Sequence, residues 1–132
     1  MENLEQRRAA HALAKAYACR KQEKDGDCLP GYPSLIINSG LLATLAYSME
    51  KSVKDGRVKT ETQWWAVSSA IAFHLHNLGI VTRQQGEPDA ASLRDALTSN
   101  RCDTFTLRRA TDEALAFLGY LKRFAKQPLA VK

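Results

Sequence analysis

Hydrophobic residues recur three and four positions apart over most of the chain, which is the spacing of one face of an α-helix. The longest such stripe runs from about Asp103 to Ala125. Strand patterns, in which β-branched and aromatic residues alternate with polar ones between turns, are nearly absent. The pattern therefore predicts an all-α fold, a compact bundle of five to six helices that forms a single domain over residues 1–132, which is a usual domain length.

Glycine, proline and capping residues set the expected bounds of the helices. We expect a first helix from Leu4 to about Glu23, ended by the positive φ of Gly26. Its buried face is expected to hold Ala9, Leu13, Ala16 and Tyr17. Further helices are expected over residues 33–37, 42–53, 60–78, 90–97 and 103–125, with Thr60 and Asp89 as N-caps and residues 54–57 as a loop.

The trio Asn38-Ser39-Gly40 interrupts an otherwise apolar segment. The residues before it and the stripe after it follow separate helical registers, which indicates two helices with different directions. Gly40 permits the bend, and either Asn38 or Ser39 is expected to cap the second helix.

The formal net charge of +5 is spread unevenly along the chain. Residues 101–132 carry seven basic and three acidic side chains, and residues 1–25 carry six and four, whereas residues 61–100 carry two and four. Basic terminal segments point to an acidic partner. The start of the chain lacks the apolar core of a signal peptide, and no apolar run is long enough to span a membrane, so we expect a cytoplasmic protein. The three cysteines, without a paired motif, are expected to be reduced thiols.

No catalytic constellation stands out. His74 and His76 are two residues apart, which on a helix turns them about 200° from each other, so they cannot share one metal. We expect one at the edge of the core and one at the surface, and His11 has no obvious partner. A glycine-rich phosphate loop, a Gly-x-Ser-x-Gly elbow and a buried carboxylate pair are all missing, so neither enzymatic activity nor a cofactor or metal is expected.

The outer side of the last helix is the best candidate surface. Opposite its apolar stripe lie Arg109, Asp112, Ala116, Gly119 and Arg123. A glycine in an exposed helix costs roughly 1 kcal/mol relative to alanine, so Gly119 indicates either close approach of a phosphate backbone or subunit, or a tolerated residue on a solvated face. Ion pairs Arg108–Asp112 and Arg109–Glu113 are expected on this side. Trp64 falls on the buried stripe of its helix, and Trp65 lies on the flank, either at an interface or partly buried in the core.

Three blocks of the chain carry a family resemblance. They are LEQRRAAHAL (residues 4–13), YPSLIINSGLLATLAYSMEK (32–51) and LRRATDEALAFLGYLKRFAK (107–126). In order and spacing they resemble the small-subunit family of the type III-B CRISPR–Cas complex, the fifth subunit of the Cmr RNA-silencing module. The pattern I-x-x-x-G-L-x-x-T-L-A within the second block, together with the third block, is the most specific part.

The resemblance implies a non-catalytic helical subunit of an antiviral ribonucleoprotein. Copies of such a subunit stack into a short filament beside the guide-RNA-bound backbone nuclease subunit, in a complex that also holds a large polymerase-like subunit. Basic side chains then help to bind the guide and target RNA. We assign RNA binding to Arg8, Lys15, Lys122, Arg123 and Lys126, and contacts between subunits to Trp65, Arg109 and Gly119.

Two alternative functions are based on other features of the sequence. A free-standing helical regulator of nucleic acids would place a recognition helix after a turn at Ser99–Cys102, within the segment Ala90–Ala125. An enzyme would need a metal at His74 and His76, which the helical geometry disfavours.

Overall fold

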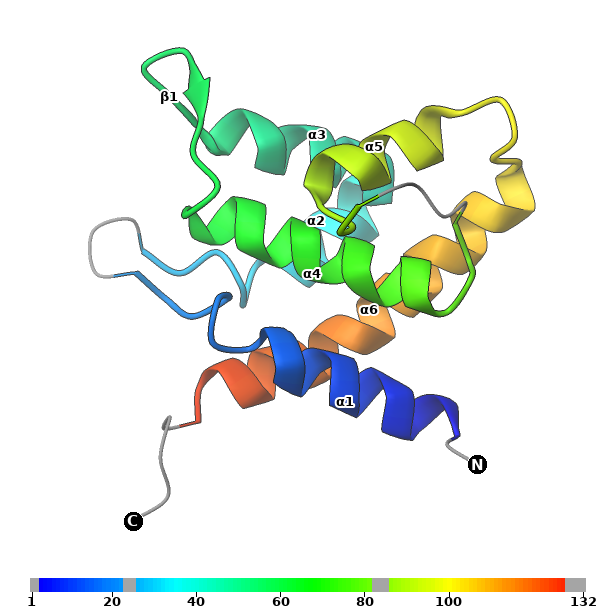
Figure 1. Cartoon of the computed structure of the whole chain (residues 1–132), viewed down its shortest axis with the longest axis horizontal. Coiled ribbons are helices and arrows are strands. Elements are labelled where there is room, and N and C mark those ends of the chain that lie inside the picture. The colour runs from blue at the N-terminus through cyan, green and yellow to red at the C-terminus, as the bar shows by residue number, and fades with distance from the viewer. Residues whose placement is uncertain (1–2, 23–25, 82–85, 128–132) are drawn as a thin grey trace.

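The computed structural model describes residues 3–22, 26–81 and 86–127 (Figure 1). Within them the chain forms six helices and one short hairpin, which confirms the expected all-α bundle. The helices are α1 (Leu4–Lys15), α2 (Tyr32–Ser39), α3 (Leu41–Lys51), α4 (Gln63–Asn77), α5 (Ala90–Thr98) and α6 (Thr104–Ala125). Strands β1 (Val53–Lys54) and β2 (Arg57–Val58) pair antiparallel between α3 and α4.

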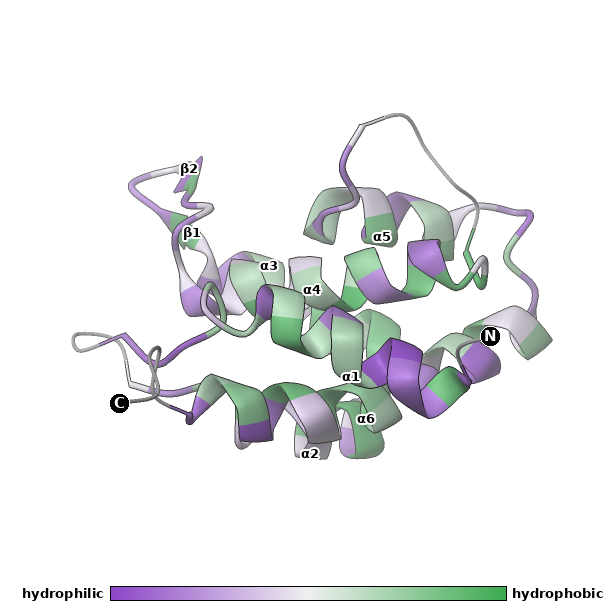
Figure 2. Ribbon diagram, turned by 60° about the horizontal axis from the view of Figure 1, so that its bottom comes forward, coloured by the Kyte–Doolittle hydropathy of each residue, from purple (hydrophilic) through white to green (hydrophobic). Residues whose placement is uncertain are grey.

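Helix α4 lies in the middle of the bundle and packs against α1, α3, α5 and α6. Its fully buried side chains Val67, Ile71 and Leu75 form the centre of the core, together with Phe117 and Leu118 of α6. Figure 2 shows hydrophobic positions on the inner sides of the helices and a strongly hydrophilic start of α1. Helix α1 packs mainly on α6, so the two basic terminal segments are neighbours in space.

The break at Asn38-Ser39-Gly40 separates α2 from α3, as predicted. Gly40 has φ 89°, and its amide N–H donates to the carbonyl of Ile36 at 2.7 Å to end α2. The expected cap by Asn38 or Ser39 is wrong, because α3 starts from Gly40 without a side-chain cap. Thr44, one turn later, donates its hydroxyl to the Gly40 carbonyl at 2.8 Å.

Helix α1 is shorter than expected. It ends at Lys15, and tighter turns follow, in which the amide of Cys19 donates to the carbonyl of Ala16; the predicted end at Glu23 lies outside the described residues. The predicted buried face is also wrong in part, since Leu13 is 62% and Tyr17 68% exposed. Small residues face the core instead, with Ala12 and Cys19 fully buried, because a small side chain lets α1 approach α6 closely.

The segment before α4 forms a hairpin where a loop was expected. Asp55 and Gly56 both have positive φ, 55° and 74°, which matches the right-handed twist of the two short strands. The hairpin takes Val53 out of the α3 stripe and leaves it exposed. It also delays the start of α4, so that the N-cap is Thr62 and not Thr60. The predicted N-cap Asp89 is confirmed, in a capping box before α5, and the remaining predicted ends lie within two residues of the observed ones.

Candidate nucleic-acid interface

The outer side of α6 is exposed at Arg109, Asp112 and Arg123 and half-buried at Ala116 and Gly119. The helix has 22 residues and is about 33 Å long. The exposed charged residues of the helix and its C-cap are Arg108, Arg109, Asp112, Arg123 and Lys126, with Lys122 half-buried. A Cβ added at Gly119 would meet no atom within 4 Å, so packing inside this chain does not require the glycine. The surface of α6 and its C-cap therefore carries five cations and one exposed carboxylate. The residues in the middle of the outer face, Ala116 and Gly119, are small.

Neither ion pair expected along α6 is present in the part of the chain that the structure describes. Arg108 and Arg109 form no ion pair there. Glu113, expected on the outer side, is instead buried at the junction of α1, α4 and α6, where it bonds to Arg8 and His74. The two arginines consequently remain on the surface without a carboxylate partner among the described residues.

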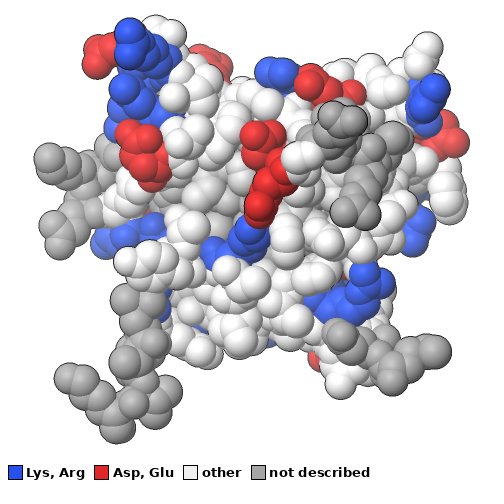
Figure 3. Space-filling view, viewed as in Figure 1, with Lys and Arg blue, Asp and Glu red and all other residues white. Residues whose placement is uncertain are grey.

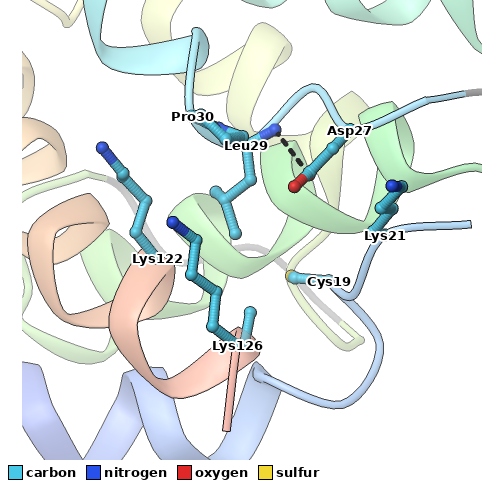
Figure 4. A pocket seen from close by; sticks show the side chains of 8 residues that line it. Cys19, Lys21, Asp27, Leu29, Pro30, Lys122 and Lys126 are labelled. Atoms are coloured by element: carbon cyan, nitrogen blue, oxygen red, sulfur yellow. Dashed lines mark hydrogen bonds between the residues drawn. The ribbon is translucent and has the colours of Figure 1, made fainter.

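A pocket of about 240 Å³ lies at the C-terminal end of α6 (Figure 4). We call it the lysine pocket; it is lined by Cys19, Lys21, Asp27, Leu29, Pro30, Lys122, Ala125 and Lys126. Figure 4 shows Lys122 and Lys126 extending from α6 toward the segment that carries Leu29 and Pro30, while Lys21 comes from the segment after α1. Two stretches distant in sequence, one at Lys21 and one at the end of α6, thus bring three ammonium groups to one cavity.

Gln63, at the start of α4, holds the two segments that shape the lysine pocket. Its amide nitrogen donates to the Cys19 carbonyl at 3.0 Å and to Asp27 Oδ1 at 2.7 Å. Its amide oxygen accepts from the Cys28 backbone N–H at 2.8 Å. Only the fold reveals that this buried amide positions the pocket wall.

The floor of the lysine pocket is apolar and uncharged. Leu29 and Cys19 are both buried. Burial raises the pKa of the Cys19 thiol to about 12, and burial likewise raises the pKa of Cys28 to about 12. Both thiols are therefore protonated at neutral pH, which makes them poor nucleophiles. All three cysteines of the chain are free.

A second group of charged residues, which we call the ionic cluster, consists of Arg8, His11, His74 and Glu113. Arg8 binds Glu113 with two bonds, from Nε to Oε2 at 2.6 Å and from Nη2 to Oε1 at 2.8 Å. His74 Nε2 donates to Glu113 Oε2 at 2.8 Å, because a carboxylate can only accept. In the neutral ring Nδ1 then accepts from His11 Nδ1–H, at 2.7 Å.

The surroundings shift the pKa values within the ionic cluster. Burial lowers the pKa of His74, against the opposing pull of Glu113. For Glu113, burial alone would raise the pKa, but the hydrogen bonds from Arg8 and His74 outweigh it and lower the pKa. Two sequence-based expectations are wrong here: His74 and His76 are both buried, and His11 does have a partner. The apolar contacts of His74, whose ring stacks on Phe117 at 4.5 Å between centroids, hold it in the core.

The remaining predicted residues lie apart from the lysine pocket. Lys15 Nζ is 3.1 Å from Glu87 Oε1 and 4.3 Å from the centre of the Phe73 ring. Trp65 is half-buried against the core. Figure 3 shows basic and acidic side chains interspersed on one face, with a basic group over the β1–β2 hairpin that the sequence patterns did not single out. Its exposed members include Lys51, Lys54 and Arg57.

Comparison with known proteins gives one match. The family model described as "CRISPR-associated protein (Cas_Cmr5)" matches residues 4–127, nearly the whole chain. No curated protein and no solved structure matches the sequence. Among the described residues, no group of three His, Cys, Asp or Glu side chains is arranged to hold a metal, and none of the helices has the length and apolar character needed to cross a bilayer.

Proposed function

The chain belongs to the Cmr5 family of CRISPR-associated proteins and is therefore a subunit of a CRISPR-associated Cmr complex, and from this premise we propose that it is a non-catalytic small subunit that helps to bind the guide–target RNA duplex through basic residues at the C-terminal end of α6. The observation that carries this proposal is the charge on the surface of α6 and its C-cap. That surface exposes several cations and a single carboxylate, and the last turn of the helix opens into the lysine pocket. Such a surface favours phosphate groups without reading bases.

The decisive residues on α6 are Lys122, Arg123 and Lys126. We expect the assembled complex carrying all three alanine substitutions to bind target RNA about tenfold more weakly. We also expect the slope of log affinity against log salt concentration to fall by about 2, since each lost phosphate contact removes a little less than one unit. Fluorescence anisotropy of labelled target RNA over a salt series measures both quantities.

A matched control removes three positive charges from another place. Lys51, Arg57 and Lys59 lie around the β1–β2 hairpin, and their alanine substitutions change the net charge by the same amount. This variant is expected to retain the affinity and most of the salt slope of the native complex. Equal losses in both variants would show that overall charge matters and that α6 has no special role.

We also propose that copies of this subunit stack on one another inside the complex, through a surface that includes Trp65, Arg109 and Gly119. Support comes from the exposed position of Arg109 and from the open space around Gly119 in the middle of the outer face of α6. The large exposed side chains of Leu13 and Tyr17 in the N-terminal segment also support it. Arg109→Glu is expected to lower the number of small subunits per complex in native mass spectrometry. Arg94→Glu, on the exposed side of α5, serves as the control, and equal occupancy in both variants would refute the assignment.

A further inference from the structure

We propose that the lysine pocket binds one unstacked nucleotide of an RNA strand, with the base on the apolar floor and the phosphate between Lys122 and Lys126. The inference rests on the proposed RNA-binding function and specifies what the RNA would place at the end of α6. Three properties of the pocket support it, namely its size, its uneven charge and its floor.

The size of the pocket suits a single nucleotide. Pockets for drug-sized ligands enclose about 300–1,000 Å³, whereas this cavity encloses about 240 Å³. A duplex cannot enter such a cavity, but one base turned out of its stack can. RNA-binding proteins commonly hold unstacked bases in this way, against aromatic or apolar side chains.

Positive and negative charge lie on opposite sides of the pocket, and this arrangement favours a nucleotide over a free phosphate ion. Lys122 and Lys126 approach from α6, whereas the carboxylate of Asp27 lies on the loop side, fixed by the Gln63 amide and by the backbone N–H of Leu29. A free phosphate would be repelled by this carboxylate. A nucleotide can place its phosphate at the lysines and an N–H group of its base toward Asp27, because carboxylates accept hydrogen bonds from amino groups of bases.

The floor provides an apolar surface for the base. Leu29 and Cys19 are buried beneath the cavity, Ala125 contributes a methyl group from α6, and Pro30 adds its pyrrolidine ring at the edge. Within the described part of the chain, no carboxylate forms an ion pair with Lys21, Lys122 or Lys126. The cations at the edge are thus available to an anionic ligand, while the interior favours an apolar ring.

The test fills the cavity without changing its charge. Ala125→Leu places three extra carbon atoms against the floor and leaves all three lysines in place. With a fluorescein-labelled single-stranded oligoadenylate and the full-length protein, we expect this variant to bind about five- to tenfold more weakly than the native chain, with an unchanged salt slope. Ala46→Leu, the same substitution on the exposed side of α3, is the control and is expected to bind normally.

The outcomes separate this inference from the proposed function. Unchanged affinity of Ala125→Leu overturns the nucleotide pocket, whatever the lysine substitutions do. If the variant binds RNA normally but fails to co-purify with the other Cmr subunits, the pocket holds a side chain of a partner protein, which also overturns the inference. The expected decrease of the salt slope in the triple variant of Lys122, Arg123 and Lys126 tests phosphate binding separately.

A measurement on the native protein does not depend on the folding of any variant. We expect adenosine monophosphate to shift the backbone amide signals of Cys19, Leu29 and Ala125 in NMR spectra. Ribose 5-phosphate, which lacks the base, and inorganic phosphate are expected to shift these signals much less at the same concentration. Equal shifts from all three compounds would show an anion site without a place for the base and would refute the proposal.

Discussion

The ionic cluster and the lysine pocket are both built where the N-terminal segment meets α6, yet they treat their cations in opposite ways. In the cluster, Arg8 donates two hydrogen bonds to the buried carboxylate of Glu113. In the pocket, Lys122 and Lys126 stand around an open cavity whose one carboxylate, Asp27, is bonded to Gln63 and Leu29. The first arrangement fastens α1 to the core, and the second leaves positive charge available to a ligand.

The difference shows that the distribution of charge along a sequence does not reveal which cationic side chains can bind a ligand and which are bonded to a carboxylate of the same chain. Arg8 and Lys126 were both assigned to RNA because each lies on a basic terminal helix. What separates them is the position of one carboxylate, since Glu113 faces α1 and α4, whereas among the described residues no carboxylate forms an ion pair with Lys126. The comparison predicts that Arg8 matters chiefly for stability and Lys126 chiefly for binding.

The largest expected effect concerns Glu113. Glu113→Ala removes both hydrogen bonds of the partly exposed Arg8 and leaves the buried His74 Nε2–H without its acceptor. Losing these charge-assisted bonds and leaving a buried donor unsatisfied costs about 3 kcal/mol. Urea unfolding followed by circular dichroism measures the loss in the free energy of unfolding. Asp112→Ala removes the neighbouring exposed carboxylate and is expected to change stability by less than about 0.5 kcal/mol. Similar unfolding midpoints for the two variants would mean that the cluster contributes little.

The second prediction compares the two cations directly. Arg8→Ala is expected to lower the free energy of unfolding by about 2 kcal/mol, because Glu113 then retains only His74 as a partner. Lys126→Ala is expected to leave stability nearly unchanged and to reduce the salt slope of RNA binding by about 0.7 to 0.9. If Arg8→Ala instead keeps its stability and loses RNA affinity, the original RNA-binding assignment of Arg8 is correct and the comparison is wrong.

Helix positions could be predicted well from the sequence because periodicity and caps are local signals. The stripe of α6, the break at Gly40 and the cap at Asp89 all depend on residues a few positions apart. Errors arose where distant contacts decide the outcome. The end of α1 and its buried face depend on how closely Ala12 can approach α6, which no local pattern encodes.

The candidate site was predictable only in part. Lys122 and Lys126 were found from their charge, but Lys21, Asp27 and Gln63 join them through folding of segments 35 or more residues apart. The ionic cluster was missed for the same reason, since Arg8 and Glu113 are 105 positions apart and His74 is 39 from Glu113. The helical period of 3.6 residues could have indicated that Glu113 is buried, since it places Glu113 beside Ala110 and Ala114 near the apolar stripe.

The third prediction uses pH to examine the ionic cluster. Since burial lowers the pKa of His74 in the folded chain, the unfolded chain binds a proton near pH 6.5 that the folded chain resists. The contribution of His74 to stability is therefore fully present well above pH 6.5 and declines as the pH falls through about 6.5. The lowered pKa of Glu113 adds a further decline below about pH 4.3, the range in which the unfolded chain takes up carboxylate protons.

Urea unfolding at several pH values measures this decline, and His74→Asn identifies its source. The variant is expected to be less stable at pH 7 but to lose little further stability between pH 7 and 5.5. An unchanged decline in His74→Asn would assign the pH dependence to other groups. The lysine pocket provides the contrast, because Lys126→Ala should follow the native pH profile.

The smallest expected effect lies between the two regions, at Gly119. Alanine at this position meets no atom within 4 Å, so Gly119→Ala should stabilise α6 by about 0.5–1 kcal/mol and raise the melting temperature by a few degrees. Ala116→Gly, one turn earlier on the same face, should lower it by a similar amount. If Gly119→Ala stabilises the isolated chain and yet weakens its incorporation into the Cmr complex, the glycine serves the approach of a neighbour. Normal incorporation would instead make Gly119 a tolerated residue on a solvated face, and the subunit contact would have to lie elsewhere.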